Sequence, residues 1–121
     1  MKRLITTVAL AAAVLTVGAV TPAHATPISR ANAVRSAKQY LQFQAFSKRG
    51  LVGQLKYDGF STYDATYGAS HSGANWMKQA VRSAKSYLKF QAFSRSGLVG
   101  QLEYDGFTHS QALHGALAVG L

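Results

Sequence analysis

Residues 46–61 read FSKRGLVGQLKYDGFS, and residues 93–108 read FSRSGLVGQLEYDGFT, a near copy at an offset of 47 positions. The match continues without a gap toward the N-terminus, where AVRSAK at 33–38 returns at 80–85. Shared helical composition does not produce an ungapped match of this length at a single offset. The chain therefore contains a tandem duplication of one module of about 45 residues.

Apolar residues within a module recur at a helical spacing. Val34, Ala37, Leu41 and Ala45 lie at i, i+3, i+7 and i+11 and form one apolar stripe. No segment alternates apolar and polar residues in the way that a strand with one buried face does. We therefore predict an all-α fold with three short helices in each module.

The predicted organisation is a segment at 1–25 followed by two helical repeats, at 26–73 and 74–121. A module of this size is near the limit at which an isolated core becomes marginal. We therefore expect the two repeats to pack together. The second repeat is expected to begin with Asn75 as the cap of its first helix.

Hydroxyl and glycine residues mark the ends of the second helix in each repeat. Ser47 and Ser94 precede the Leu and Val residues of that helix, where a side-chain oxygen can cap free amide groups. Gly59 and Gly106 follow it, and glycine adopts the left-handed conformation needed past a helix end. Capping boxes are expected to open the third helices, at Ser61 with Asp64 and at Thr108 with Gln111.

The second helix of each repeat also contains two internal glycines, each of which costs about 0.8–1 kcal/mol relative to alanine. Because both repeats keep them in phase with the Leu and Val face, we predict that they permit a close helix crossing; a weak helix is the alternative. They are Gly50, Gly53, Gly97 and Gly100.

The first 25 residues have the pattern of a secretory signal peptide. Lys2 and Arg3 precede an unbroken stretch of apolar, Gly and Thr residues at 4–20, and Ala23 and Ala25 fit the site of signal peptidase. We predict cleavage after Ala25; an uncleaved membrane anchor is the alternative. Without Lys2 and Arg3, the 13 Lys and Arg residues become 11, which against four Asp and Glu gives a secreted chain of charge +7.

Composition excludes most catalytic and metal chemistry. The chain has no Cys, which excludes disulfides, thiolate zinc sites, Cys nucleophiles and an acylated cysteine anchor. His71, His109 and His114 lack the spacing of metal ligands, and neither a GxSxG elbow nor a phosphate-binding loop motif occurs. We predict no catalytic residues, no metal and no cofactor, and therefore a non-enzymatic protein.

The basic residues are the remaining functional signal. Arg82, Lys85 and Lys89 lie at i, i+3 and i+7 on one helix face, and Arg35 and Lys38 begin the same row in the first repeat. Such a row is typical of a surface that binds polyanions, and equally of a solvated face that keeps a small protein soluble.

Aromatic residues add a second candidate contact surface. Trp76 has no aromatic counterpart, because Ser29 occupies its position in the first repeat. Trp76 therefore either fills the junction between the repeats or contacts a partner, and burial is the commoner outcome for such a residue. The full set of candidate partner-binding residues is Arg35, Lys38, Tyr40, Trp76, Arg82, Lys85, Tyr87 and Lys89.

The motif F-S-x-x-G-L-x-x-Q-L-x-Y-D-G-F-[ST] at 46–61 and 93–108, with G-A-N-W at 73–76 between its copies, resembles the Ltp family of host cell surface-exposed lipoproteins. These proteins are encoded by temperate phages and found in their bacterial hosts. The resemblance implies helix-turn-helix-like helical repeats. It also implies superinfection exclusion, in which a surface protein engages the tape-measure protein of an incoming phage and blocks injection of its DNA.

The chain departs from the family pattern in two respects. Family members carry a cysteine after the signal sequence, whereas this chain has none, so we expect a secreted or surface protein without a lipid anchor. Asp58 and Asp105 also stand where Glu is usual. Two alternatives to exclusion remain open, namely a basic module that binds cell-envelope polyanions or membrane surfaces, and a nucleic-acid-binding helix-turn-helix protein. The oligomeric state is not indicated.

Overall fold

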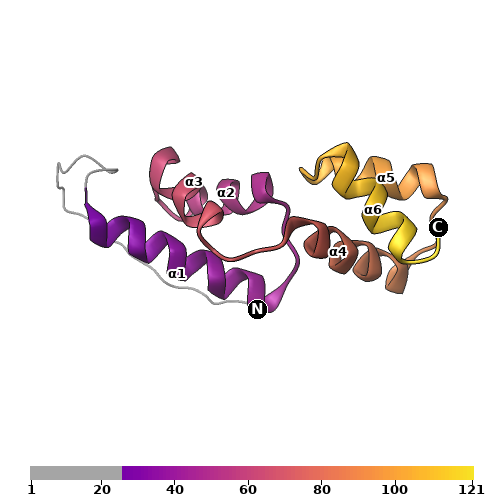
Figure 1. Ribbon diagram of the computed structural model, residues 1–121, viewed down its shortest axis with the longest axis horizontal. Helices are drawn as coiled ribbons and strands as arrows, with labels where there is room; N and C mark the ends of the chain where they lie inside the picture. Colours follow the sequence, from indigo (N-terminus) through magenta and orange to yellow (C-terminus); the bar gives the residue numbers. More distant parts are fainter. Residues whose placement is uncertain (1–25) are drawn as a thin grey trace.

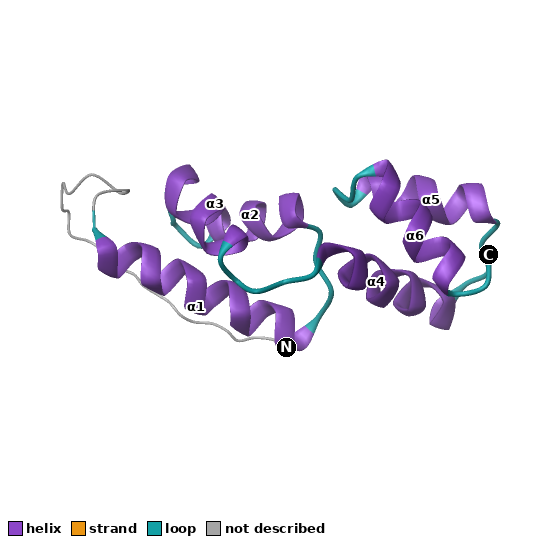
Figure 2. Cartoon of the chain, viewed as in Figure 1, coloured by secondary structure: helices purple, strands orange, loops and turns teal. Residues whose placement is uncertain are grey.

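Six α-helices make up residues 26–121, the part of the chain that the computed structural model describes; the predicted signal peptide and its cleavage site at Ala23 and Ala25 lie outside it. Strands are absent from these residues, which confirms the all-α prediction (Figure 2). The helices are α1 (Pro27–Phe43), α2 (Lys48–Tyr57), α3 (Thr62–Ser70), α4 (Trp76–Phe90), α5 (Arg95–Tyr104) and α6 (His109–Ala118).

A polar side chain opens each helix by accepting the backbone N–H three residues later. Ser47 accepts from Gly50 and Ser94 from Gly97, as predicted. The six caps are Thr26, Ser47, Ser61, Asn75, Ser94 and Thr108. The predicted capping box is complete only in α6, because the Asp64 side chain in α3 accepts from Ser29 instead.

Gly59 and Gly106 end α2 and α5, as predicted. Their φ angles are 106° and 110°, a conformation that only glycine adopts without a Cβ penalty. The following amide, at Phe60, donates to the Leu55 carbonyl at 3.1 Å, and Phe107 repeats this bond in the second repeat. This reversal turns the aromatic ring back onto the helix that has just ended.

Each repeat builds its own core, in which the third helix packs on the first and second. In the first repeat Leu51 and Leu55 are fully buried, and Leu98 and Leu102 hold the same places in the second. The repeated leucines of the second helix are therefore the largest apolar side chains at the centre of each core.

The close helix crossings are not where the glycines of the second helix predicted them. A Cβ on Gly53 or Gly100 would meet nothing within 4 Å, so the prediction for these positions is wrong. The backbones instead approach at Gly68 in α3, where a Cβ would lie 2.7 Å from the Ala33 carbonyl of α1. Gly115 in α6 makes the same approach to α4. The third helix therefore needs glycine for the helix crossing, whereas a Cβ at Gly50 or Gly97 would meet the capping serine of its own helix at 3.0 Å.

The two repeats lie one after the other along the long axis of the described region (Figure 1). In this view α1 and α4 follow one another along the lower side, and the other four helices lie above them. The main helix packing within residues 26–121 joins helices of the same repeat, so the repeats meet over a narrow junction. None of the described helices combines the length and the apolar character that a membrane crossing requires.

Candidate functional site

All four carboxylates of the chain are engaged by neighbouring side chains of the fold. Asp64 is completely buried and accepts a hydrogen bond from the Ser29 hydroxyl at 2.5 Å. Glu103 Oε2 lies 2.5 Å from His109 Nδ1, a contact that is an ion pair when the imidazole is protonated. Asp58 and Asp105 accept bonds from Tyr40 and Tyr87. No Asp or Glu side chain therefore forms an ion pair with a Lys or Arg side chain in the described region.

A polar brace, made of Tyr40, Gln54 and Asp58, joins α1 to the end of α2. The Tyr40 hydroxyl donates to Asp58 Oδ2 at 2.5 Å, and the Gln54 amide donates to Asp58 Oδ1 at 3.2 Å. The same amide group also donates to the Tyr40 oxygen at 3.2 Å. The corresponding residues of the second repeat, Tyr87, Gln101 and Asp105, form the same tyrosine–aspartate and glutamine–aspartate bonds.

The polar brace explains why the aspartate, the glutamine and the tyrosine recur together in the sequence. Burial raises the pKa of Tyr40 to about 12, and the hydrogen bond to Asp58 adds to this because the neighbouring carboxylate disfavours tyrosinate. Burial and Asp105 raise the pKa of Tyr87 to about 12 in the same way. The hydroxyl groups of Tyr40 and Tyr87, predicted as partner contacts, are therefore occupied inside the fold.

Lysine and arginine side chains have different surroundings. All six lysines of residues 26–121 are exposed and make no hydrogen bond, and Arg35 is exposed likewise. Four arginines instead donate to oxygen atoms of the fold: Arg30 to the Tyr63 hydroxyl, Arg49 to the Tyr104 carbonyl, Arg82 to the Leu41 carbonyl and Arg95 to the Leu121 carbonyl. Seven exposed cations, the six lysines and Arg35, thus make no side-chain hydrogen bond, and we call them the open cations.

Arg82 belongs to the junction between the repeats. Its guanidinium donates to the Leu41 carbonyl at 2.9 Å and to Gln79 Oε1 at 3.1 Å, so it connects α4 to the end of α1. The predicted row therefore divides, with Arg82 bonded inside the molecule and Lys85 and Lys89 exposed. Lys78, which the sequence analysis did not include, is exposed on the same helix.

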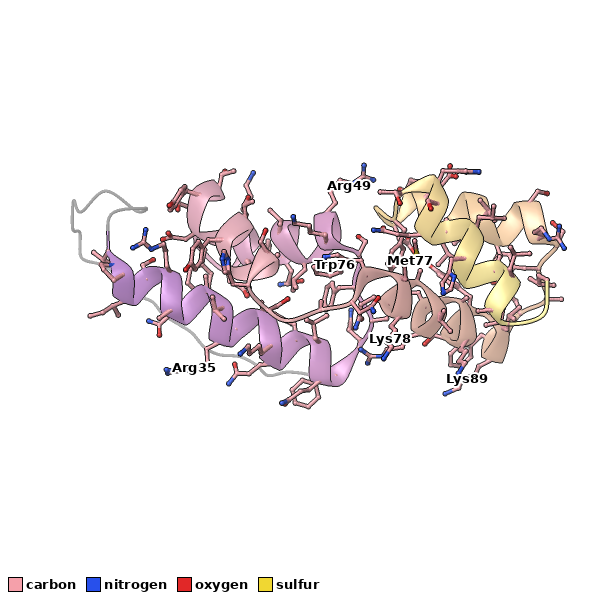
Figure 3. The ribbon with its side chains drawn as sticks, viewed as in Figure 1. Arg35, Arg49, Trp76, Met77, Lys78 and Lys89 are labelled. Carbon is pink, nitrogen blue, oxygen red and sulfur yellow. The ribbon has the colours of Figure 1, made fainter. Side chains whose placement is uncertain are left out.

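Five of the seven open cations lie on α1 and α4, and we call them the α1–α4 edge: Arg35, Lys38, Lys78, Lys85 and Lys89. Neither helix contains an Asp or a Glu. Figure 3 shows Arg35, Lys78 and Lys89 along the lower side of the molecule, and Arg49 on the opposite side. The structure thus places Arg35, Lys78 and Lys89 on one side of the molecule, across both repeats (Figure 3).

Trp76 lies at the junction, and its contact with a partner stays a prediction. It is the first residue of α4, yet its side chain is partly buried against the core of the first repeat. The backbone amide of Phe46 adds a bond across the junction by donating to Gln79 Oε1 at 3.2 Å. Trp76 therefore stabilises the contact between the repeats.

An aromatic stack in the first repeat was not found by sequence reasoning. The Tyr67 ring stacks on His71 at 3.9 Å, and the Arg30 guanidinium lies 5.5 Å from the centre of the Tyr67 ring. The second repeat has Met77 and His114 at the positions of Arg30 and Tyr67, so the duplication gave no signal here. Among the described residues no group of three His, Asp or Glu side chains is placed to hold a metal ion.

Comparison with known proteins identifies the family to which the chain belongs. The family model of host cell surface-exposed lipoproteins, Ltp, matches residues 29–71 and 75–115, one match for each repeat. The chain belongs to the Ltp family. No match was found among curated proteins.

The solved structure of one family member has a similar fold over nearly the whole length of that member. It is Ltp, a superinfection exclusion protein from the Streptococcus thermophilus temperate phage TP-J34, with a TM-score of 0.71 and 32% sequence identity. The match covers 79% of this chain and 98% of the phage protein. Both the family match and this structure agree with the two helical repeats inferred from the sequence.

Proposed function

We propose that this Ltp-family protein acts outside the cytoplasmic membrane as a superinfection exclusion protein and blocks entry of phage DNA. The observation that carries the proposal is the likeness to the TP-J34 protein, which extends through both repeats and over 98% of that chain. The family description, host cell surface-exposed lipoprotein, supports the location. The signal peptide predicted at 1–25 supplies the route of export.

The proposed mechanism is binding and not turnover. By family resemblance the partner is the tape-measure protein of the incoming phage. The described surface offers large aromatic anchors of the kind that dominate protein interfaces. Phe43 and Phe90 are 84% and 86% exposed at equivalent positions, so the two cores leave them available for a partner.

Phage challenge of cells that produce the protein tests the proposal. Adsorption and DNA entry are scored separately, in cells that make the full chain and in cells that make a version without residues 1–25. We expect normal adsorption and blocked entry, with the block lost when residues 1–25 are removed. Unchanged entry across a panel of phages that infect the producing strain would contradict the exclusion role.

Phages that escape exclusion identify the partner. If the tape-measure protein is engaged, escape changes map to its gene and adsorption is unaltered. Escape through the receptor-binding proteins, accompanied by changed adsorption, would instead show that the protein masks a receptor. The double variant Phe43→Gln/Phe90→Gln is expected to weaken exclusion, whereas Lys48→Gln/Lys56→Gln, on α2, is the control for a surface change of equal size.

A further inference from the structure

Most of the exposed cations that make no side-chain hydrogen bond lie on two of the six described helices, α1 and α4. Three of the four Asp and Glu side chains are hydrogen-bonded to residues of α1 or α4, but none forms an ion pair with a lysine in the described region. Seven cations of residues 26–121 are exposed without a bonded partner, and five of them form the α1–α4 edge. Like charges held this close repel one another, and an external polyanion would relieve that repulsion.

The lysines of α4 are arranged as a line. Lys78, Lys85 and Lys89 are separated by seven and four residues, which places them within about 40° around the helix at steps of about 10 Å and 6 Å along it. The corresponding positions of α1 hold Ala31, Lys38 and Gln42. The second repeat therefore carries two more charges in this line than its copy does, and Arg35 on α1 lies along the same lower side of the molecule (Figure 3).

We propose that the α1–α4 edge binds a linear phosphodiester polymer of the cell envelope, of the poly(glycerol phosphate) type. Lysine ammonium groups on flexible stems bind phosphates as point charges and do not demand a fixed geometry, which suits a flexible polymer. This binding holds the protein at the cell surface in a chain that has no cysteine to carry a lipid. It does not depend on the exclusion role.

The geometry favours a polymer over a membrane surface. A helix that lies in a lipid interface combines cations with apolar residues that enter the bilayer beside them. Phe90, the exposed aromatic residue of α4, is turned by about 100° from Lys89 and about 140° from Lys85 around the helix axis. The line of lysines therefore meets a polyanion without presenting an apolar face to lipid.

The test measures binding of the full protein to purified poly(glycerol phosphate) by calorimetry at several salt concentrations. Two matched variants each remove two exposed, unbonded lysines: Lys85→Gln/Lys89→Gln on the edge and Lys48→Gln/Lys56→Gln on α2. If each edge lysine contacts one phosphate, the affinity at 0.1 M salt falls by about 25-fold for the edge variant. We expect a loss below about threefold for the α2 variant, and a binding constant that falls steeply with salt.

Three outcomes would overturn the proposal. Equal losses in the two variants would show that net charge alone attracts the polymer. Tighter binding to duplex DNA than to poly(glycerol phosphate) at equal phosphate concentration would favour nucleic-acid recognition. Binding to vesicles that contain anionic lipid, without binding to the polymer, would assign the edge to the membrane surface.

Discussion

The Ser47 hydroxyl donates a hydrogen bond to the backbone carbonyl of Asp105 at 2.7 Å, across the junction between the repeats. The same oxygen accepts the Gly50 amide at 2.9 Å and so also begins α2. Ser47 is 2% exposed, whereas its copy Ser94 is exposed, caps α5 and otherwise contacts only the nearby Ser96 hydroxyl, at 3.5 Å. One oxygen atom thus connects local helix formation to the assembly of the two repeats.

Replacing Ser47 or Ser94 with alanine separates the contribution of the helix cap from that of the bond across the junction. Ser94→Ala is expected to cost about 1 kcal/mol of unfolding free energy because one helix cap is lost. Ser47→Ala loses the same cap and in addition the bond to Asp105, worth about 1 kcal/mol more. Urea unfolding followed by circular dichroism measures both values. Equal losses for Ser47→Ala and Ser94→Ala would show that the junction bond contributes nothing to stability.

Glycine to alanine substitutions are predicted to have opposite effects in neighbouring helices. Gly68→Ala would place a Cβ 2.7 Å from the Ala33 backbone, and such overpacking costs about 1–3 kcal/mol. Gly53→Ala enters open space inside α2 and is expected to stabilise the protein by about 0.8–1 kcal/mol. Thermal unfolding of the two variants gives the sign directly. A neutral Gly68→Ala would mean that α1 and α3 can move apart without loss.

The sequence predicted helix ends well because caps act within a few residues. The capping bonds of Ser47 to Gly50 and of Gly59 to Lys56 each span three positions, so the partners are visible in the sequence. Repetition of the same residues in the second repeat confirmed the pattern without any knowledge of packing. The number of helices and the all-α class followed from these local signals.

Long-range contacts were not predictable in this way. Gly53 and Gly68 look alike in the sequence, and only the crossing of α1 over α3 makes one of them necessary. Arg82 aligns with Lys85 and Lys89 on one helix face, yet the Leu41 carbonyl that binds its guanidinium is 41 residues away. The duplication also concealed the differences between copies, since Ser47 and Ser94 have the same sequence context but different neighbours.

Trp76 provides a test of how strongly the repeats are coupled. Trp76→Ala removes a side chain that is partly buried against the first core, and we expect a cost of about 2 kcal/mol, below that of a fully buried tryptophan. Met77→Ala is the matched control, because Met77 follows Trp76 on α4 and its side chain is 38% exposed. Chemical unfolding compares the two. A loss for Met77→Ala as large as that for Trp76→Ala would remove the tryptophan from the junction.

The two polar braces predict how stability changes at high pH. The tyrosine pKa, ordinarily 10.0, is raised to about 12 at Tyr40 and Tyr87, so each contributes stability in full below pH 10 and loses it as the pH rises toward 12. When the protein is titrated with base, tyrosinate absorbance near 295 nm should therefore rise in a late step as the pH approaches 12. Tyr40→Phe and Tyr87→Phe should each reduce the height of this late step by half. The same variants should flatten the fall in unfolding free energy between pH 10 and 12. Tyr57→Phe is the control, because this side chain is 87% exposed and the late step should stay intact. A late step that survives in the double variant Tyr40→Phe/Tyr87→Phe would show that it does not come from these two tyrosines.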